Sequence, residues 1–167
     1  MGARSITSGG EAILAAANET DLNTTETIMP DADSHEAYFR AVLTELYAGN
    51  FEPFNAAIAE DYICHTPGRS SIAGDYHGTE QAEVKRPKMR ALTAGSFKVR
   101  KLGDICISGD WAMVPVVVSA EAGDTRLETP AFGIWRFRGD KIVEHWEMNF
   151  DQYGFDAFVA AAEAQGR

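Results

Sequence analysis

Three long segments with apolar residues at alternate positions, joined by two tight turns, constrain the fold most strongly. They cover residues 111–118, 125–138 and 141–150, and Gly123-Asp124 and Gly139-Asp140 stand between them. Alternation with a period of two is typical of β-strands, and a Gly-Asp pair between two such strands is typical of a hairpin turn. The sequence therefore predicts a meander of antiparallel strands in the second half of the chain.

Helical patterns precede these strands. Apolar residues recur at helical spacing over 34–48, 51–59 and 79–92, and Pro87 is expected to kink the third helix. Shorter strands are predicted over 61–66, 97–102 and 105–107, and Asp151 is expected to cap a closing helix. Helices followed by a run of strands indicate an α+β domain. We predict a domain over residues 34–167 and a flexible, polar N-terminal arm over residues 1–33.

Composition and charge exclude several classes of function. The chain has 167 residues, 45% of them hydrophobic, and a formal net charge of −10, which disfavours nucleic acid and anionic membranes as partners. No apolar run approaches a membrane span of about 20 residues, and no secretory signal is visible. Cys64 and Cys106 are too few for a disulfide framework. We therefore expect a cytoplasmic protein with reduced thiols.

One basic cluster interrupts the acidic background. Lys85, Arg86, Lys88 and Arg90 fall within six residues of the third predicted helix. We interpret the cluster as a solvated helix face, and an anion-binding site is the alternative.

The last predicted hairpin carries the most information. With a two-residue turn at Gly139-Asp140, Phe137 faces Ile142, Ile134 faces His145 and Phe132 faces Glu147. This register gives two largely apolar faces: Phe132, Ile134, Val143, His145 and Glu147 on one, and Trp135, Phe137, Ile142, Trp146 and Met148 on the other. Because helices are expected to cover only one face of the sheet, we predict that the second face packs against another copy in a homodimer. The alternative is that the N-terminal arm covers it.

The first face holds two titratable side chains, His145 and Glu147, side by side. Desolvation in an apolar wall raises the pKa of a carboxyl, and a neighbouring histidine titrates in the same range, so the pair suits general acid/base chemistry. His65, at the end of a strand, is a third candidate. The alternative explanation is that these side chains are hydrated groups at the ends of strands and have no catalytic role. These three residues could also form a two-His, one-carboxylate metal set, but no close histidine spacing supports it, and we expect neither a metal nor a cofactor.

A family resemblance adds to these patterns. Tyr62-Ile63-Cys64-His65-Thr66-Pro67, Tyr76-His77-Gly78-Thr79-Glu80 and, above all, residues 137–147 (FRGDKIVEHWE) resemble the nuclear transport factor 2-like superfamily and its SnoaL-like polyketide cyclase and ketosteroid isomerase-like group. The resemblance covers about residues 34–164. It implies a cone-shaped, curved antiparallel sheet with three N-terminal helices over its concave face and a C-terminal helix.

The resemblance also implies a conical pocket. In this group, the position of Glu147 often holds an acid, and that of His65 often faces inward. The Arg-x-Asp of the limonene epoxide hydrolase type is absent at Val114-Pro115-Val116, which disfavours that reaction. We expect the pocket to have substrate-binding residues Tyr38, Ile63, Trp111, Phe132, Ile134 and Val143.

We predict a cofactor-independent isomerase or cyclase of a small hydrophobic carbonyl compound, polyketide-like or terpenoid-like. Glu147 would move a proton at the carbon next to the carbonyl, His145 would relay, and His65 would bind the developing enolate oxygen. A hydrolase or dehydratase using the same residues is one alternative, and a non-catalytic binding or assembly module is the other.

Overall fold

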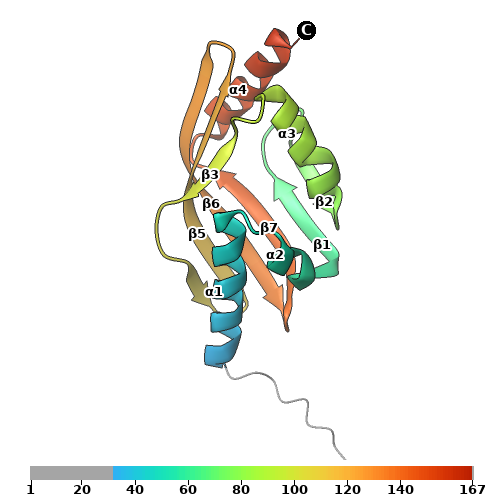
Figure 1. Cartoon of the computed structure of the whole chain (residues 1–167), viewed down its shortest axis with the longest axis vertical. Helices are drawn as coiled ribbons and strands as arrows, with labels where there is room; N and C mark the ends of the chain where they lie inside the picture. Colours follow the sequence, from blue (N-terminus) through green and yellow to red (C-terminus); the bar gives the residue numbers. More distant parts are fainter. Residues whose placement is uncertain (1–31, 167) are drawn as a thin grey trace, which may run out of the picture.

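A curved sheet organises the molecule, whose computed structural model describes residues 32–166 (Figure 1). Apart from its last two residues, which begin the first helix, the predicted N-terminal arm over 1–33 lies outside the described residues. The helices are α1 (Ala32–Ala48), α2 (Glu52–Ala57), α3 (Arg86–Leu92) and α4 (Gln152–Gln165), and a π-helical segment, η1 (Gln81–Lys85), runs directly into α3. The strands are β1 (Ile58–Thr66), β2 (Gly74–His77), β3 (Lys98–Lys101), β4 (Cys106–Ser108), β5 (Trp111–Ala122), β6 (Thr125–Arg138) and β7 (Lys141–Asn149).

The sheet confirms the predicted α+β class and corrects two details. Its strand order is β2-β1-β7-β6-β5-β3, with β4 also paired to β5, so it is an open sheet. All pairs are antiparallel except β1 with β7, which run parallel. No short turn joins β1 to β7, so their relative direction could not be predicted from local sequence. The second correction is β2, which lies between the predicted strand over 61–66 and the predicted helix over 79–92, where we predicted neither a helix nor a strand.

The hairpin of β6 and β7 contains a β-bulge that the predicted register lacks. Phe137 faces Ile142 as expected, but Val143 is an extra residue, and Arg136 then faces Glu144. The later predicted pairings are therefore wrong by one residue: His145 faces Trp135 rather than Ile134. A regular strand would place residues 142 and 145 on opposite faces, whereas the bulge lets both face the helices.

The inner face of the sheet packs against the helices and forms the core. Phe39 of α1 stacks on Phe137 with 3.7 Å between ring centroids, and Phe54 of α2 meets Trp135 edge-on. Asp151 Oδ1 accepts a hydrogen bond from the Gly154 amide at the start of α4, at 2.8 Å, which confirms the predicted cap. Within residues 32–166, none of the helices has both the length and the apolar character needed to cross a membrane.

The outer face differs in composition from our prediction because of the bulge. Trp135, Phe137 and Ile142, which we assigned to it, are buried in the core. Cross-strand pairing places a row of mostly apolar side chains there instead: Trp111, Met113, Phe132, Ile134, Trp146 and Met148.

Candidate functional site

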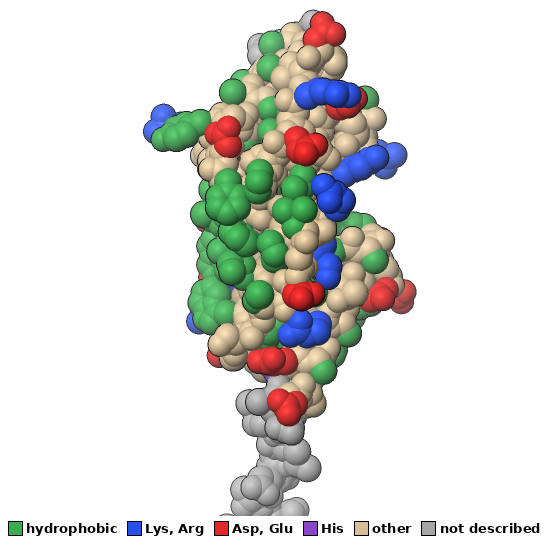
Figure 2. Space-filling view, turned by 90° about the vertical axis from the view of Figure 1, so that its left-hand side faces the viewer, with side chains coloured by type: hydrophobic (Ala, Val, Ile, Leu, Met, Phe, Trp, Pro, Cys, Tyr) green, Lys and Arg blue, Asp and Glu red, His purple; other side chains and the backbone are tan. Residues whose placement is uncertain are grey.

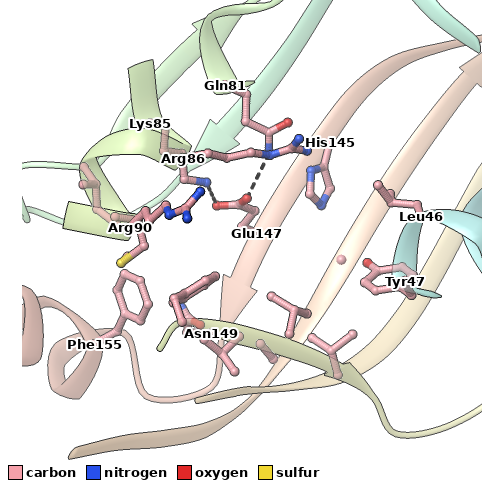
Figure 3. Close-up of a pocket in the computed structure, with 18 of the residues that line it drawn as sticks. Leu46, Tyr47, Gln81, Lys85, Arg86, Arg90, His145, Glu147, Asn149 and Phe155 are labelled. Carbon is pink, nitrogen blue, oxygen red and sulfur yellow. Dashed lines mark hydrogen bonds and ion pairs between the residues drawn. The ribbon is translucent and has the colours of Figure 1, made fainter. Parts of the chain in front are cut away.

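A cavity of about 720 Å³ lies between the inner face of the sheet and the helices. This volume suits a small organic ligand. Figure 3 shows its polar end, where side chains from η1 and α3 point toward β7. Most of the remaining wall is apolar and includes Leu46, Met89, Phe97, Val99, Val116, Val118 and Phe155.

The Glu147 carboxylate is the centre of the polar end. It forms an ion pair with the Lys85 ammonium, and it accepts hydrogen bonds from Thr66 Oγ1 at 3.0 Å and from Gln81 Nε2 at 3.1 Å. Burial raises the pKa of Glu147, but Lys85 and the hydrogen bonds outweigh burial and lower it to about 2. The carboxyl is therefore ionised at neutral pH, contrary to our expectation of a raised pKa.

Gln81 and Lys85, the two partners of the Glu147 carboxylate that precede α3, are the first and last residues of the π-helical segment η1. In η1 the Arg86 amide bonds to the Gln81 carbonyl, five residues back, directly before Pro87, which lacks an amide hydrogen. Gln81 and Lys85 both have buried side chains and both contact Glu147. Lys85 is only 7% exposed, so our interpretation of a fully solvated basic helix face is wrong for this residue.

His145 lies beside Glu147 on the inner face. Its ring stacks on Trp135 at 3.6 Å with 2° between the planes, and its Nδ1 is 3.7 Å from Cys64 Sγ. Burial lowers the pKa of His145 to about 3, because the opposing effect of the Glu147 carboxylate is smaller and the positive charges of Lys85 and Arg86 act in the same direction as burial. The imidazole is therefore neutral at pH 7.

Gly133 makes room for a third polar group. A Cβ atom at this position would lie 2.3 Å from the Tyr47 hydroxyl, 3.0 Å from Trp135 Nε1 and 3.4 Å from His145 Nε2. These three polar atoms therefore surround one point on the cavity wall. Trp135 Nε1 is buried and has no hydrogen-bond partner among the residues described. Burial and the charge of Glu147 raise the pKa of Tyr47, which keeps its hydroxyl protonated.

The structure separates the three predicted catalytic residues. Glu147 and His145 line the cavity together, whereas His65 lies on the outer face. There the His65 ring stacks on Trp146 at 4.8 Å, and its Nδ1 is 2.8 Å from Asp75 Oδ1. The structure therefore does not place His65 inside the pocket as we predicted, because Tyr62, Cys64 and Thr66 are on the inward-facing side of β1.

Most of the predicted substrate-binding residues also lie outside the cavity. Phe132 borders it, although its ring contacts Phe150 at 5.1 Å. Val143 is the bulge residue, and Tyr38 is exposed on α1. The bulge and the parity of the strands place Ile63, Trp111 and Ile134 away from the site. The sequence analysis did not identify Tyr47, Gln81 or Lys85 as residues of the site. Of these, only Lys85 had a signal in the sequence, because it belongs to the basic cluster.

Cys64, His145 and Glu147 place one potential metal-ligand atom each within 4.8 Å of one another. Two observations disfavour a metal ion at this cluster. The Lys85 ammonium already occupies the carboxylate, and burial raises the pKa of Cys64 to about 12, which opposes formation of a thiolate ligand.

The structure is an α+β fold in which a curved open sheet and the helices enclose a cavity. The chain matches the SnoaL-like domain model over residues 36–145, more than half of its length, and therefore belongs to the SnoaL-like domain family. The matched range ends two residues before Glu147. No curated protein sequence matches the chain significantly.

Solved structures support the same fold. A protein of unknown function with a cystatin-like fold from Xanthomonas campestris is 26% identical, with a TM-score of 0.64, and the match covers 74% of this chain and 96% of that one. Bal32a, from a soil-derived mobile gene cassette, has the same identity and TM-score, with coverage of 76% and 97%. IdmH of Streptomyces antibioticus, a candidate polyketide cyclase, is 17% identical with a TM-score of 0.52, covering 78% and 98%. An NTF2-like protein from Burkholderia pseudomallei shares the fold (15% identical, TM-score 0.57, covering 75% of this chain and 96% of that one), which agrees with the predicted nuclear transport factor 2-like architecture.

Proposed function

We propose that this protein is a cofactor-independent cyclase or isomerase of a small hydrophobic carbonyl compound. The observation that carries the proposal is the polar end of the cavity, where the ionised Glu147 carboxylate lies near the three polar atoms that surround Gly133. Family membership supports a reaction of this class, and the apolar walls would exclude water from it.

In this mechanism Glu147 removes a proton from the carbon next to a carbonyl. The developing enolate oxygen accepts hydrogen bonds from the Tyr47 hydroxyl and from Trp135 Nε1, the roles that we first assigned to His65. Neutral His145 lies between these groups and orients the substrate. The protonated Glu147 then returns the proton to carbon. In a cyclase, the enolate carbon instead attacks a second carbonyl group and closes a ring, and the resulting alkoxide takes the proton from Glu147.

The ion pair with Lys85 limits the substrates that Glu147 could deprotonate, because it lowers the pKa of the carboxyl. A carboxyl with a pKa of about 2 is a weak base. Proton transfer to a weak base is efficient only from an acidic carbon, and a carbon between two carbonyl groups is the most acidic of the common types. A polyketide-like 1,3-dicarbonyl compound therefore fits the site better than a simple ketone.

The test is hydrogen exchange at carbon. Aromatic β-keto esters and cyclic 1,3-diketones are incubated with the protein in deuterated buffer at mildly acidic pH, and NMR follows the loss of the α-proton signal beyond the uncatalysed rate. Glu147→Gln should lower the catalysed rate about 10²-fold, while Glu144→Gln, on the outer face of the same strand, should have little effect. Equal exchange with the unaltered protein and the Glu147→Gln variant would rule out this role.

A non-catalytic binding protein is the second candidate. It is favoured by one observation: both oxygens of Glu147 already accept hydrogen bonds from protein side chains. In that case ligands would bind with no α-proton exchange, and Glu147→Gln would alter only affinity.

We also propose that the outer face of the sheet mediates a homodimer and that the protein is cytoplasmic. Trp111, Met113 and Met148 are each more than 40% exposed on this face. Figure 2 shows hydrophobic side chains gathered on the side of the molecule that includes β5 and β6. An apolar patch of this kind is typical of an interface. The free thiol of the exposed Cys106 supports a reducing compartment.

A further inference from the structure

The charged side chains that line the cavity are unbalanced in sign. Lys85, Arg86 and Arg90 reach it from η1 and α3, and Glu147 is the one carboxylate among the lining residues that the structure describes. Lys85 and Glu147 neutralise each other. Arg86 and Arg90 therefore give the cavity an excess of positive charge, in a protein whose formal net charge is −10.

Neither of these arginines has an acidic partner. Over residues 32–166, the ion pairs of arginine involve Arg126, Arg136 and Arg138, which lie on the surface. Arg86 is half-buried and lies over the Phe51 ring, 4.4 Å from its centroid. A guanidinium in this setting keeps its charge and its fork of N–H donors available to a ligand.

Both arginines start from the part of α3 that lines the cavity. Arg86 and Arg90 are four residues apart, so they are neighbours on the surface of α3. Figure 3 shows both side chains on the side of the cavity from which Lys85 reaches Glu147. Like charges at this spacing repel, and an anion bound between them would offset the repulsion.

We propose that the ligand of this cavity carries an anionic group, a carboxylate or a comparable acid, which Arg86 and Arg90 bind. The apolar body of the ligand then lies against Met89, Phe97 and Phe155. This inference rests on the proposed function of the cavity and narrows its substrates to hydrophobic acids. It places the acidic group of the ligand beside α3 and the reacting carbons beside Glu147, at the same polar end of the cavity.

Two fluorescent probes that differ in one anionic group test this inference. The anionic probe is 1-anilinonaphthalene-8-sulfonate, and the neutral one is N-phenyl-1-naphthylamine, the same molecule without its sulfonate. The unaltered protein should bind the sulfonate about tenfold more tightly, and salt should weaken only that probe. The double variant Arg86→Gln/Arg90→Gln should bind the sulfonate about tenfold more weakly and the neutral probe equally well. Lys98→Gln/Arg100→Gln, an equal loss of charge at two exposed positions on β3, should change neither affinity.

Amide chemical shifts of the titrated protein show where each probe binds. Shifts at α3 and Phe155 support the inference, whereas shifts confined to β5 and β6 on the outer face contradict it. Equal affinity for the two probes inside the cavity would overturn the anion site and leave the proposed function intact, because neutral ketones could still exchange their α-protons. The salt titration on the unaltered protein gives the same answer if the double variant fails to fold.

Discussion

The two faces of β7 show how neighbouring residues of one strand acquire opposite chemistry. On the inner face, the buried His145 contacts Trp135 and Cys64, and the half-buried Glu147 pairs with the buried Lys85. On the outer face, Glu144 pairs with Arg136, and Trp146 stacks between His65 and Trp111. Both faces hold a histidine, a carboxylate, a tryptophan and a cation. The inner histidine, tryptophan and cation are more buried than their outer counterparts, whereas the side chains of Glu147 and Glu144 are similarly exposed, at 30% and 23%.

This comparison indicates that burial, more than residue type, creates the candidate site. Burial lowers the pKa of His145 to about 3, whereas the outer residues lie where water screens their charges. Four predictions test the contrast, beginning with the largest expected effect.

Lys85→Met should destabilise the protein most, because it leaves the Glu147 carboxylate buried without a counter-ion. The free energy of unfolding should fall by about 3–5 kcal/mol, measured by denaturant titration. Adding Glu147→Gln should restore part of this loss, since the unpaired charge is then gone. Lys88→Met, on the outside of the same helical region, is the matched control and should change stability little. If Lys85→Met and Lys88→Met behave alike, the buried ion pair does not form.

Trp111→Glu should break the proposed homodimer, because a charge would be buried at the interface. Its dissociation constant should rise about 30-fold or more, as expected for an interface hot spot. Light scattering after gel filtration measures the mass of each species. Val84→Glu changes another exposed apolar residue, outside the outer face, and should leave the mass unchanged. A monomeric unaltered protein would contradict the proposal.

The stability of the protein should fall as the pH is lowered from about 6.5 toward 4.5. His145 has a lowered pKa in the folded state, so below its usual pKa of 6.5 the unfolded chain binds the extra proton. The slope is about 1.4 kcal/mol per pH unit, or about 2–3 kcal/mol over this range. His145→Asn should flatten this part of the profile, as measured by denaturant titration at a series of pH values.

Glu147 adds a separate loss of stability at lower pH. Its lowered pKa in the folded state contributes stability that is present above about pH 4.5 and lost as the pH falls toward 2. In the Glu147→Gln variant, the loss of stability below about pH 4.5 should be smaller. The loss of stability between about pH 6.5 and 4.5, which His145 causes, should remain. A single transition unaffected by either substitution would show that other groups dominate acid unfolding.

Gly133→Ala should have the smallest effect of the four, about 1–3 kcal/mol, typical of overpacking. The new methyl group would lie 2.3 Å from the Tyr47 hydroxyl and must displace it. In a Tyr47→Phe background the same substitution should cost clearly less, because the hydroxyl is absent. Thermal unfolding of the four proteins in this cycle measures the coupling. Independent effects at the two positions would mean that Tyr47 does not lie over Gly133.

Local sequence determined much of this protein. Alternation and the two Gly-Asp turns predicted β5, β6 and β7 closely, and the spacing of His145 and Glu147 placed both on one face. Asp151 was recognisable as a cap because its hydrogen bond reaches only three residues along the chain. The family motif in residues 137–147 indicated the architecture that the structure confirms. These features depend on period, turn chemistry and neighbouring residues.

Tertiary structure decided the rest, because the deciding contacts join distant segments. The bulge at Val143 allows Ile142 and His145 both to face the helices. An alternating sequence pattern cannot predict this bulge, because the contacts with the helices favour it. Lys85 and Glu147 are 62 residues apart, and only the packing of η1 over β7 shows that the lysine is buried and the carboxyl strongly acidic. The same packing turned Arg86 and Arg90 toward the cavity and left His65 on the outer face.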